Sequence, residues 1–544
     1  MPLDPAPKPV VLLIFDGWGI GPANAGNAIT QANIPNFRKF SVSFPHTQLT
    51  ASGEAVGLPR GEDGNTETGH LNIGAGKIVY QDLPRINMSI ADGTFETNQV
   101  FLQAFDQVKR NNSKLHLMGL VGSGGVHSNI NHLYALLSAA KKNGLSDNVI
   151  LHLFTDGRDS PPTAGVSFIT QIQQHIDSLH VGIIGSVMGR YYAMDRDRRW
   201  DRTQLAYDAL TVGTDCTNRN PADIVQERYN AGETDEFIKP FSLCDANGKP
   251  HLVNDNDAVI FFNFRIDRPR QLTKAFVLPN FESGIVSEGF DPYAIKYEGS
   301  HIRPKGPTQT FQRKKIIKNL FFVTMTEYER GLPASIAFPP QTVDMPLGRV
   351  ISEQNLHQLR MCETEKERFV TYYFNGQRED AFPNEDRIII PSKKVATYDQ
   401  APEMSAYEIT TTLIEKINTD MYALIVVNFA NADMVGHTGN LQAGIKACEI
   451  LDECLGKIVA AVNVKNGVVL VTADHGNAEE MINNETGEID TEHSTYPVPL
   501  LIISNRYQNQ GRMLPSGILA DIAPTILSIM GISKPTSMTG RALI

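Results

Sequence analysis

The feature that most constrains the fold is a set of four apolar, β-branched runs that each lead into a polar cluster. The runs are VVLLIF (10–15), VILHLFT (149–155), ALIVVNF (423–429) and GVVLVTA (467–473), and the clusters are DGWG, DGRDS, ANADMVGH and DHGN. Such runs, separated by longer amphipathic stretches, are typical of strands that helices cover on both faces. We therefore expect an α/β fold with these clusters at the carboxyl ends of strands, where open α/β sheets bind ligands.

The length of the chain indicates more than one domain. At 544 residues it exceeds what a single core usually supports. Two stretches have the composition of domain connections, namely 74–85 and the segment 297–319, which is rich in Lys, Arg, Pro and Gly. If both are linkers, a domain of residues 80–319 is inserted into a discontinuous domain of residues 1–79 and 320–544.

Composition narrows the classes of partner. The net charge of −11 argues against a general nucleic-acid binder, and no run approaches the ~18 apolar residues of a membrane span. The N-terminus lacks the basic region of a signal peptide. The cysteines are odd in number and lack zinc-type spacing, which favours a reducing compartment and inert core thiols at positions 216, 244, 362, 448 and 454. We expect a cytoplasmic monomer that acts on a small molecule.

The polar clusters supply a candidate metal site of three aspartates and three histidines. Its members are Asp16, Asp433, His437, Asp474, His475 and His493. Taken singly, each residue has a plainer interpretation as a turn former, an interface histidine or a surface residue. Their joint occurrence favours two divalent ions, whose four positive charges would exceed three carboxylates and suit a phosphate. Mixed Asp and His ligation is typical of manganese or zinc rather than calcium.

The stretch GEDGNTETGHLNIGAGK, residues 61–77, first suggests a phosphate-binding P-loop. That motif requires Ser or Thr after its Gly-Lys, because the hydroxyl holds magnesium, and here Lys77 is followed by Ile78. The P-loop interpretation therefore fails. The residue left to explain is Thr66, with Glu67 and His70 beside it.

Ten segments in order give the chain a resemblance to a known family. They are LLIFDGWG, GNTETGHLNIGAG, GGVHS, TDGRD, GRYYAMDRDRRWDR, NFRIDRPRQL, ETEK, NADMVGHTGN, TADHGNAE and HSTYPVP. This series resembles the cofactor-independent phosphoglycerate mutases from Val11 to the C-terminus. The resemblance implies an alkaline-phosphatase-like open sheet domain with two Mn²⁺ ions and an inserted α/β domain that binds glycerate. It also implies interconversion of 3-phosphoglycerate and 2-phosphoglycerate in glycolysis without 2,3-bisphosphoglycerate.

The resemblance also assigns roles to individual residues. One ion is expected on Asp433, His437 and His493, and the other on Asp16, Thr66, Asp474 and His475. The expected substrate contacts are His127, Arg158, Asp159, Arg190, Arg196, Arg265, Arg268 and Lys366. Guanidinium groups recognise carboxylate and phosphate in a bidentate manner, which agrees with this assignment. Without the resemblance, the arginine run and Lys366 would be interpreted as solvated surface.

The expected mechanism is a double phosphoryl transfer through a phosphothreonine. Thr66 is the nucleophile, Lys366 stabilises the phosphoryl oxygens, and Asp159 acts as acid and base while the glycerate reorients in a site closed to water. The family motif has serine at position 66 and valine at position 68, where this chain has threonine. Pro269 and a long connection at 290–319 are further departures. The alternatives are a metal-dependent phosphatase, a phosphopentomutase-like enzyme or a non-catalytic metabolite binder.

Overall fold

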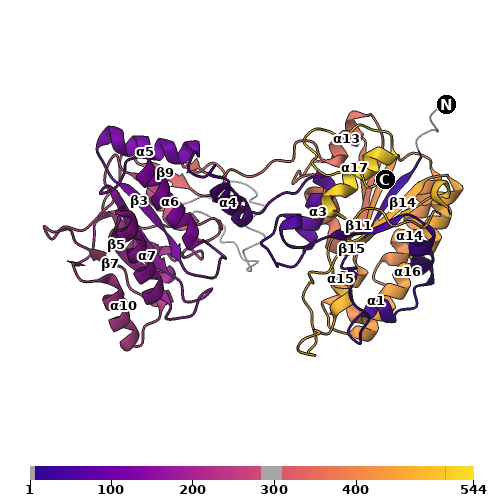
Figure 1. Cartoon of the computed structure of the whole chain (residues 1–544), viewed down its shortest axis with the longest axis horizontal. Coiled ribbons are helices and arrows are strands. Elements are labelled where there is room, and N and C mark those ends of the chain that lie inside the picture. Colours follow the sequence, from indigo (N-terminus) through magenta and orange to yellow (C-terminus); the bar gives the residue numbers. More distant parts are fainter. Residues whose placement is uncertain (1–6, 284–308, 509) are drawn as a thin grey trace. The chain divides into compact units, whose positions relative to one another are not determined.

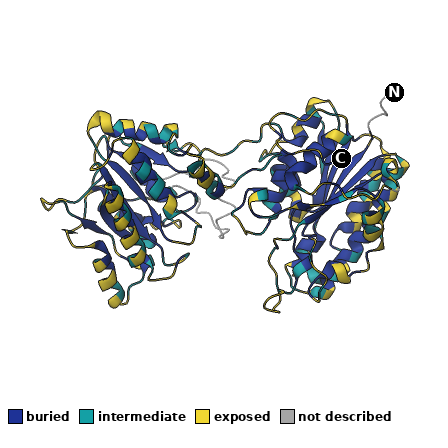
Figure 2. Ribbon diagram, viewed as in Figure 1, coloured by how far each residue is buried: buried dark blue, intermediate teal, exposed yellow. Residues whose placement is uncertain are grey.

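The computed structural model describes residues 7–283, 309–508 and 510–544, and the chain divides into two compact units (Figure 1). The discontinuous unit consists of Met1–Pro84 and Gln341–Ile544, and the inserted unit of Arg85–Pro340. Each unit has its own sheet with helices around it, and the strands are buried while the outer faces of the helices are exposed (Figure 2). The predicted α/β fold class is confirmed.

The sheet of the discontinuous unit is parallel at its centre. Its strand order is β12 (Glu385–Ile390), β11 (Gln358–Glu363), β13 (Leu424–Phe429), β1 (Val10–Phe15), β14 (Val468–Thr472), β15 (Val498–Ile503), β2 (His46–Thr50) and β16 (Gly517–Ile518). The first five strands pair in parallel, whereas β15 is antiparallel to both neighbours. Three of the four apolar runs therefore form adjacent strands of one sheet, because β13, β1 and β14 are neighbours.

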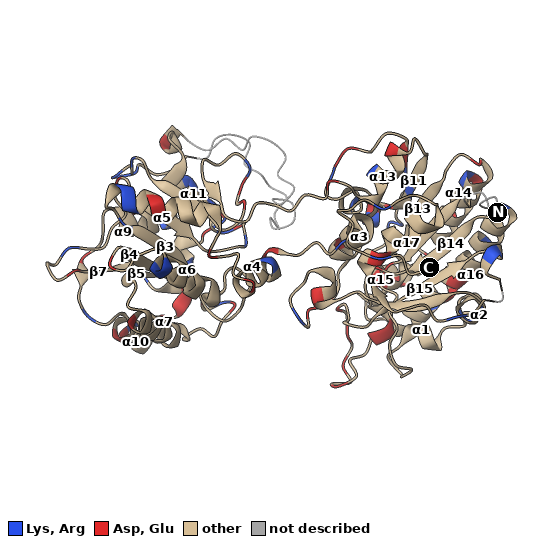
Figure 3. Cartoon of the chain, turned by 45° about the horizontal axis from the view of Figure 1, so that its top comes forward, with Lys and Arg blue, Asp and Glu red and all other residues tan. Residues whose placement is uncertain are grey.

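Helices cover this sheet and bury its apolar side chains in one large core. They are α1 (Ala28–Gln31), α2 (Pro35–Ser43), α3 (Thr66–Ala75), α13 (Leu347–Glu353), α14 (Ala406–Asn418), α15 (Asn431–Gly436), α16 (Leu441–Val464) and α17 (Ile522–Ile529). Every residue of β1, β13, β14 and β15 is buried and none is charged, which explains why the central strands are uncoloured in Figure 3.

The inserted unit has a second sheet around the remaining apolar run. Its strand order is β10 (Ser335–Ile336), β9 (Phe321–Thr324), β8 (Ala258–Phe261), β3 (Leu115–Val121), β4 (Val149–Thr155), β5 (Ile183–Gly189), β7 (Phe241–Leu243) and β6 (Cys216–Thr217). Its helices are α5 (Gln99–Asn111), α6 (Ile130–Lys142), α7 (Gly165–Leu179), α8 (Arg190–Ala193), α9 (Trp200–Thr211), α10 (Pro221–Asn230) and α11 (Arg270–Val277). Pro269 directly precedes α11 and does not interrupt it.

The structure places the unit boundaries later than the predicted residues 80 and 319. Helix α4 (Asp82–Ala91) spans the first boundary, so the predicted linker 74–85 is partly helical. At the second boundary, β9 pairs with β8, and these later strands complete the sheet of the inserted unit. The side chain of Arg313 is buried there and donates to the carbonyl oxygens of Ala275 and Leu278. The described part of the predicted linker 297–319 therefore packs on the inserted unit, while residues 290–308 of the long connection lie outside the described residues.

The cysteine expectation was wrong for one pair. Cys216 and Cys244 form a disulfide with their Cα atoms 5.4 Å apart. The pairing of β6 with β7 brings together two residues that are 28 positions apart in the sequence. Cys362, Cys448 and Cys454 are buried free thiols, as expected.

Within the described ranges, no helix combines the length and the apolar character needed to cross a lipid bilayer.

Candidate metal-ligand cluster and arginine pocket

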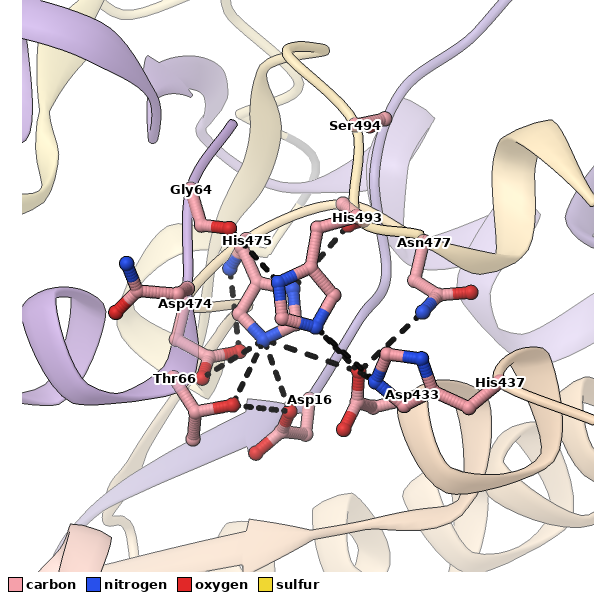
Figure 4. A network of polar contacts seen from close by, with 12 residues as sticks. Asp16, Gly64, Thr66, Asp433, His437, Asp474, His475, Asn477, His493 and Ser494 are labelled. Atoms are coloured by element: carbon pink, nitrogen blue, oxygen red, sulfur yellow. Dashed lines mark hydrogen bonds and ion pairs between the residues drawn. The ribbon is translucent and has the colours of Figure 1, made fainter. Parts of the chain in front are cut away.

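Four adjacent parallel strands place the candidate ligands at one edge of the discontinuous unit's sheet. Asp16 follows β1 directly, Asp474 and His475 follow β14, and α15 with Asp433 follows β13. Lys366 ends the short helix after β11. Because parallel strands end at the same edge, residues separated by more than 400 positions lie within hydrogen-bond distance of one another (Figure 4).

Thr66 reaches this edge from the first turn of α3. The side chain of Asn65 caps the helix by accepting from the amide of Thr68 at 2.9 Å. The hydroxyl oxygen of Thr66 lies 2.9 Å from Nε2 of His475 and 3.2 Å from Nζ of Lys366. A helix N-terminus carries partial positive charge, so this position favours an anionic oxygen or a phosphoryl group.

The glycines around Thr66 allow close packing rather than an unusual backbone turn. A Cβ atom on Gly69 would lie 2.6 Å from Cβ of Asp474, and one on Gly64 would lie 2.9 Å from Cβ of His475. Neither residue has a positive φ. These glycines therefore let the segment before α3 and its first turn lie directly against the Asp474–His475 loop.

The three histidines are oriented in the way that metal ligands usually are. In each of them Nδ1 lies close to a backbone carbonyl oxygen. The distances are 2.7 Å from His437 to Thr491, 3.2 Å from His475 to Gly476 and 2.9 Å from His493 to Gly64. A carbonyl oxygen only accepts, so each Nδ1 carries a hydrogen and Nε2 is the nitrogen left to bind either a proton or a metal ion. Asp433 Oδ1 lies 3.2 Å from Nε2 of His437 and 3.3 Å from Nε2 of His493. A proton or a metal cation between these nitrogens and the carboxylate makes the contacts favourable.

The charge of the cluster also requires cations. Asp16, Asp433 and Asp474 are buried, and the single ammonium of Lys366 lies 2.9 Å from Asp16 Oδ1 and 2.6 Å from Asp433 Oδ2. Three carboxylates and one ammonium leave two negative charges in a buried place, which is unfavourable without further cations. Burial lowers the pKa of His475, but the charge of Asp474 and the neighbouring aspartates outweighs burial and raises it to about 10, so without a metal the imidazole holds a proton where a metal ion would bind.

The ligand atoms form two overlapping groups that fit two ions. Those of Asp16, Asp474 and His475 lie within 4.8 Å of one another, and so do those of Asp433, His475 and His493. His437 joins the second group, since its Nε2 lies 3.1 Å from that of His493. Oδ2 of Asp474 is buried and lies 3.2 Å from Nδ1 of His70 and 3.6 Å from Nε2 of His475. The donors present therefore fit divalent metal ions of the kind that Asp and His bind.

Two residues that sequence reasoning did not assign hold the aspartates in place. The amide of Asn428, in β13, donates to Oδ2 of Asp16 at 2.7 Å. Nδ1 of His70 lies 2.9 Å from the carbonyl oxygen of Thr66 and 3.2 Å from Oδ2 of Asp474. His70 stands one helical turn after Thr66, and this spacing was the only sequence signal for its position.

The inserted unit contains a polar cavity of about 240 Å³. Four of the expected substrate residues line it, namely Arg158, Arg190, Arg196 and Arg268. Arg199 and Arg202 also line the cavity, although only Arg190 and Arg196 had been selected from the segment GRYYAMDRDRRWDR. Six guanidinium groups outnumber the three carboxylates that also line the cavity, Asp195, Asp197 and Glu236, and this excess of positive charge suits an anion with several oxygen atoms.

A buried aspartate connects the remaining substrate candidates to this cavity. Asp267 accepts from Nη1 of Arg196 at 2.9 Å and from Nε of Arg265 at 3.1 Å. Its Oδ1 also lies 3.7 Å from Nδ1 of His127. Asp267 therefore fixes Arg196 and Arg265 of the expected substrate set and lies beside His127, and sequence reasoning had not selected it.

Asp159 and His127 are both deprotonated at neutral pH and differ in charge. Burial raises the pKa of Asp159, but its hydrogen bond and charge interaction with Arg190 outweigh burial and lower it. Burial and the charge of Arg190 lower the pKa of His127 to about 3. Nε2 of His127 lies 3.7 Å from Oδ2 of Asp159. The pair therefore consists of a neutral imidazole beside an ionised carboxylate, which can act as a base.

Comparisons with known proteins agree over the whole chain. The sequence model of a family described as "BPG-independent PGAM N-terminus" matches residues 86–330. A protein of Chloroflexus aggregans is 49% identical over 541 residues, covering 99% of both chains, and one of Moorella thermoacetica is 47% identical over 538 residues, covering 99% of this chain and 98% of its own. Both are named 2,3-bisphosphoglycerate-independent phosphoglycerate mutase. The solved structure of Leishmania mexicana phosphoglycerate mutase at low cobalt concentration is 27% identical, with a TM-score of 0.54 over 99% of this chain and 98% of that one.

Proposed function

This chain belongs to the family of 2,3-bisphosphoglycerate-independent phosphoglycerate mutases, and we propose that Thr66 is its phosphoryl carrier. The enzyme interconverts 3-phosphoglycerate and 2-phosphoglycerate, an isomerisation of glycolysis, as the ten motifs predicted. The observation that supports Thr66 is the position of its hydroxyl, within hydrogen-bond distance of both His475 and Lys366 in the ligand cluster.

We propose two Mn²⁺ ions as the natural metals, held as the family resemblance assigns them. One would be held by Asp433, His437 and His493, and the other by Asp16, Thr66, Asp474 and His475. When bound, such ions lower the pKa of a coordinated hydroxyl and offset the charge of a phosphoryl group. The contacts of Nδ1 with backbone carbonyl oxygens, which leave Nε2 facing the cluster, and the buried carboxylates of this site support the assignment.

In the proposed first step, the bond from Thr66 Oγ1 to phosphorus forms while the bond from phosphorus to the glycerate oxygen breaks. Lys366 stabilises the phosphoryl oxygens, and its ammonium is held ready by Asp16 and Asp433. Burial lowers the pKa of Lys366, but the charges of Asp16 and Asp433 outweigh burial and raise it above its usual value. Lys366 therefore remains a cation throughout turnover.

In the proposed second step, the other glycerate hydroxyl attacks the phosphothreonine. We assign the binding of the glycerate to the arginine pocket and His127, and the proton transfers to Asp159. In the first step, the departing glycerate oxygen gains, through Asp159, a proton equivalent to the one that the Thr66 hydroxyl loses. In the second step, Asp159 takes the proton of the attacking hydroxyl and passes it on as the Thr66 hydroxyl is restored, so Asp159 ends each step ionised. Its lowered pKa supports the role of base, since the carboxylate is ionised at neutral pH.

A coupled assay tests this function directly. Formation of 2-phosphoglycerate from 3-phosphoglycerate is followed without 2,3-bisphosphoglycerate, after chelation and after addition of Mn²⁺. We expect turnover only with metal. Acid quenching with phosphorus-labelled substrate should then place the label on the peptide that contains Thr66, and a label on any other residue would contradict the carrier assignment.

We also propose that the enzyme is a cytoplasmic monomer with no nucleic-acid or membrane partner. Its net charge of −11 and its phosphoglycerate substrate support this proposal. Light scattering of the purified protein tests the monomer, and cell fractionation tests the location.

A further inference from the structure

The carboxylate of Glu479 is buried below the ligand cluster, and the proposed mechanism does not use it. Glu479 lies in the short helix Ala478–Glu480, within the segment DHGNAE. Its Oε2 accepts from the backbone amides of Gly19 and Asn477, each at 2.9 Å. Its Oε1 accepts from the hydroxyl of Ser494. One side chain therefore connects three segments of the chain that are far apart in sequence.

Each of these three segments carries a candidate metal ligand. Gly19 stands three residues after Asp16, Asn477 stands two residues after His475, and Ser494 directly follows His493. The connection extends to a fourth segment. The side-chain amide of Asn477 donates to Oδ1 of Asp433 at 3.4 Å, and Figure 4 shows this amide directed at that aspartate.

Glycines make room for the carboxylate. A Cβ atom on Gly19 would lie 2.3 Å from Cδ of Glu479, and one on Gly476 would lie 2.1 Å from its Oε1. A Cβ atom on Gly21 would lie 2.9 Å from its Cγ. Gly19 and Gly21 of DGWGIG and Gly476 of DHGNAE are thus explained by the same side chain, because any larger residue would displace the Glu479 carboxylate from the loops.

No cation balances this carboxylate within the described ranges of the chain, where its recorded partners are two amides and one hydroxyl. A buried carboxylate without a cationic partner is costly unless its hydrogen bonds are satisfied. The presence of a buried carboxylate at position 479 is therefore explained by the three loops that its hydrogen bonds connect.

We infer that Glu479 is a positioning residue that holds the loops of Asp16, His475 and His493 at the spacing needed to bind metal. It contacts neither substrate nor the reacting atoms in this role. The inference rests on the proposed function of the ligand cluster. Residues that orient metal ligands commonly change affinity 10–100-fold when they are removed, so we expect Glu479→Ala to weaken Mn²⁺ binding by about that factor.

Glutamine at this position separates the hydrogen bonds from the charge. Its carbonyl oxygen can accept from both backbone amides, and its NH₂ group can donate to the oxygen of Ser494. We therefore expect Glu479→Gln to bind Mn²⁺ nearly as well as wild type. If Glu479→Gln and Glu479→Ala lose the same Mn²⁺ affinity, the charge of Glu479 matters rather than its hydrogen bonds to the three loops. That result would overturn the inference.

Asp452 provides a matched control in the same unit. This buried carboxylate of α16 accepts from the backbone amides of Asn36 at 3.1 Å and Phe37 at 2.6 Å, and it touches no ligand-bearing loop. Asp452→Ala should lower the melting temperature in chelator as Glu479→Ala does, but leave the Mn²⁺ affinity unchanged. An equal loss of affinity in both variants would mean that general destabilisation explains the effect.

The experiment is calorimetric titration with Mn²⁺ alone, together with amide hydrogen exchange in chelator. Without metal, Glu479→Ala should exchange faster than wild type at residues 17–21, 474–480 and 490–496, while Asp452→Ala should not. If the amides of these loops exchange as slowly in Glu479→Ala as in wild type, the inference is refuted. Failure of the wild type to bind Mn²⁺ would instead refute the proposed function, because the exchange comparison decides the role of Glu479 without metal.

A milder variant covers the case in which Glu479→Ala does not fold. Ser494→Ala removes only the hydroxyl that donates to Oε1. We expect a smaller loss of Mn²⁺ affinity and faster exchange confined to the loop of His493. No change in either measurement would contradict the inference.

Discussion

The hydroxyl oxygen of Thr66 lies 2.9 Å from Nε2 of His475, a residue 409 positions further along the chain. Nδ1 of His475 donates to the carbonyl oxygen of Gly476, so its Nε2 faces the threonine and the aspartates. The proposed nucleophile therefore lies beside a candidate ligand nitrogen in a buried, carboxylate-rich site.

Thr66→Ala should abolish mutase turnover, whereas Thr66→Ser should retain it. Alanine removes the only hydroxyl that the proposed mechanism uses as a phosphoryl carrier, while serine keeps it and frees χ1. The coupled assay measures kcat for both variants. Thr68→Val is the control, because the Thr68 hydroxyl bonds only Asn65, and its turnover should stay near wild type. An active Thr66→Ala enzyme would rule out the carrier assignment.

Lys366→Met should lower kcat about 10²–10³-fold, the loss typical of removing one preorganised electrostatic contact in an active site. The variant keeps a side chain of similar length but removes the ammonium that lies 2.6 Å from Asp433 and 3.2 Å from the Thr66 hydroxyl. Lys393→Met is the matched control, since Lys393 pairs with Glu408 near the surface of the same unit. Steady-state kinetics decide the prediction, which fails if the two variants have similar kcat values.

Asp267→Asn should raise KM for 3-phosphoglycerate more than it lowers kcat. The asparagine side chain has one acceptor oxygen and no charge, so it cannot accept from Arg196 and Arg265 as the carboxylate of Asp267 does. Both guanidinium groups then lose their fixed position. We expect a loss of about 2–3 kcal/mol in binding, or roughly 30–150-fold in KM. Glu233→Gln, which breaks the partly exposed pair with Arg228 in the same unit, is the control and should leave KM unchanged. A fall in kcat alone would contradict the positioning role of Asp267.

The free energy of unfolding should decrease as the pH falls from about 6.5 toward 3. Burial lowers the pKa of His132 to about 3, and burial with Arg190 does the same for His127. Below pH 6.5 the unfolded chain binds protons that these folded histidines do not, and each histidine contributes about 1.4 kcal/mol per pH unit. Acid therefore favours the unfolded state throughout this range.

Urea unfolding between pH 7.5 and 4.5 measures this dependence. His132→Gln should reduce the slope by about one histidine's share. His180→Asn is the control, because His180 is exposed and asparagine tolerates its φ of 53°. Equal slopes for wild type and His132→Gln would show that His132 does not account for the acid sensitivity.

Much of the fold could be predicted from local pattern. The runs 10–15, 149–155, 423–429 and 467–473 coincide with β1, β4, β13 and β14, because strands buried on both faces need uninterrupted apolar sequence. The second boundary was predicted too early because residues 309–319 are polar. Their packing depends on Arg313, whose partners Glu282, Ala275 and Leu278 lie about thirty residues or more away in the sequence.

The sequence by itself determined the kinds of residue at the strand ends and the order of the ten motifs, because hydrophobic periodicity and ligand chemistry are properties of short segments. Only the tertiary structure decided which atoms meet: that His437 and His493 turn Nε2 toward Asp433, that Lys366 bridges two aspartates, and that Glu479 joins three loops. The Cys216–Cys244 disulfide belongs to the same class, since the pairing of β6 with β7 creates it. Apart from the Asp433–His437, Asn477–Glu479 and Glu479–Ser494 pairs, these contacts join residues from 28 to 460 positions apart, and no local sequence pattern encodes a distance across that separation.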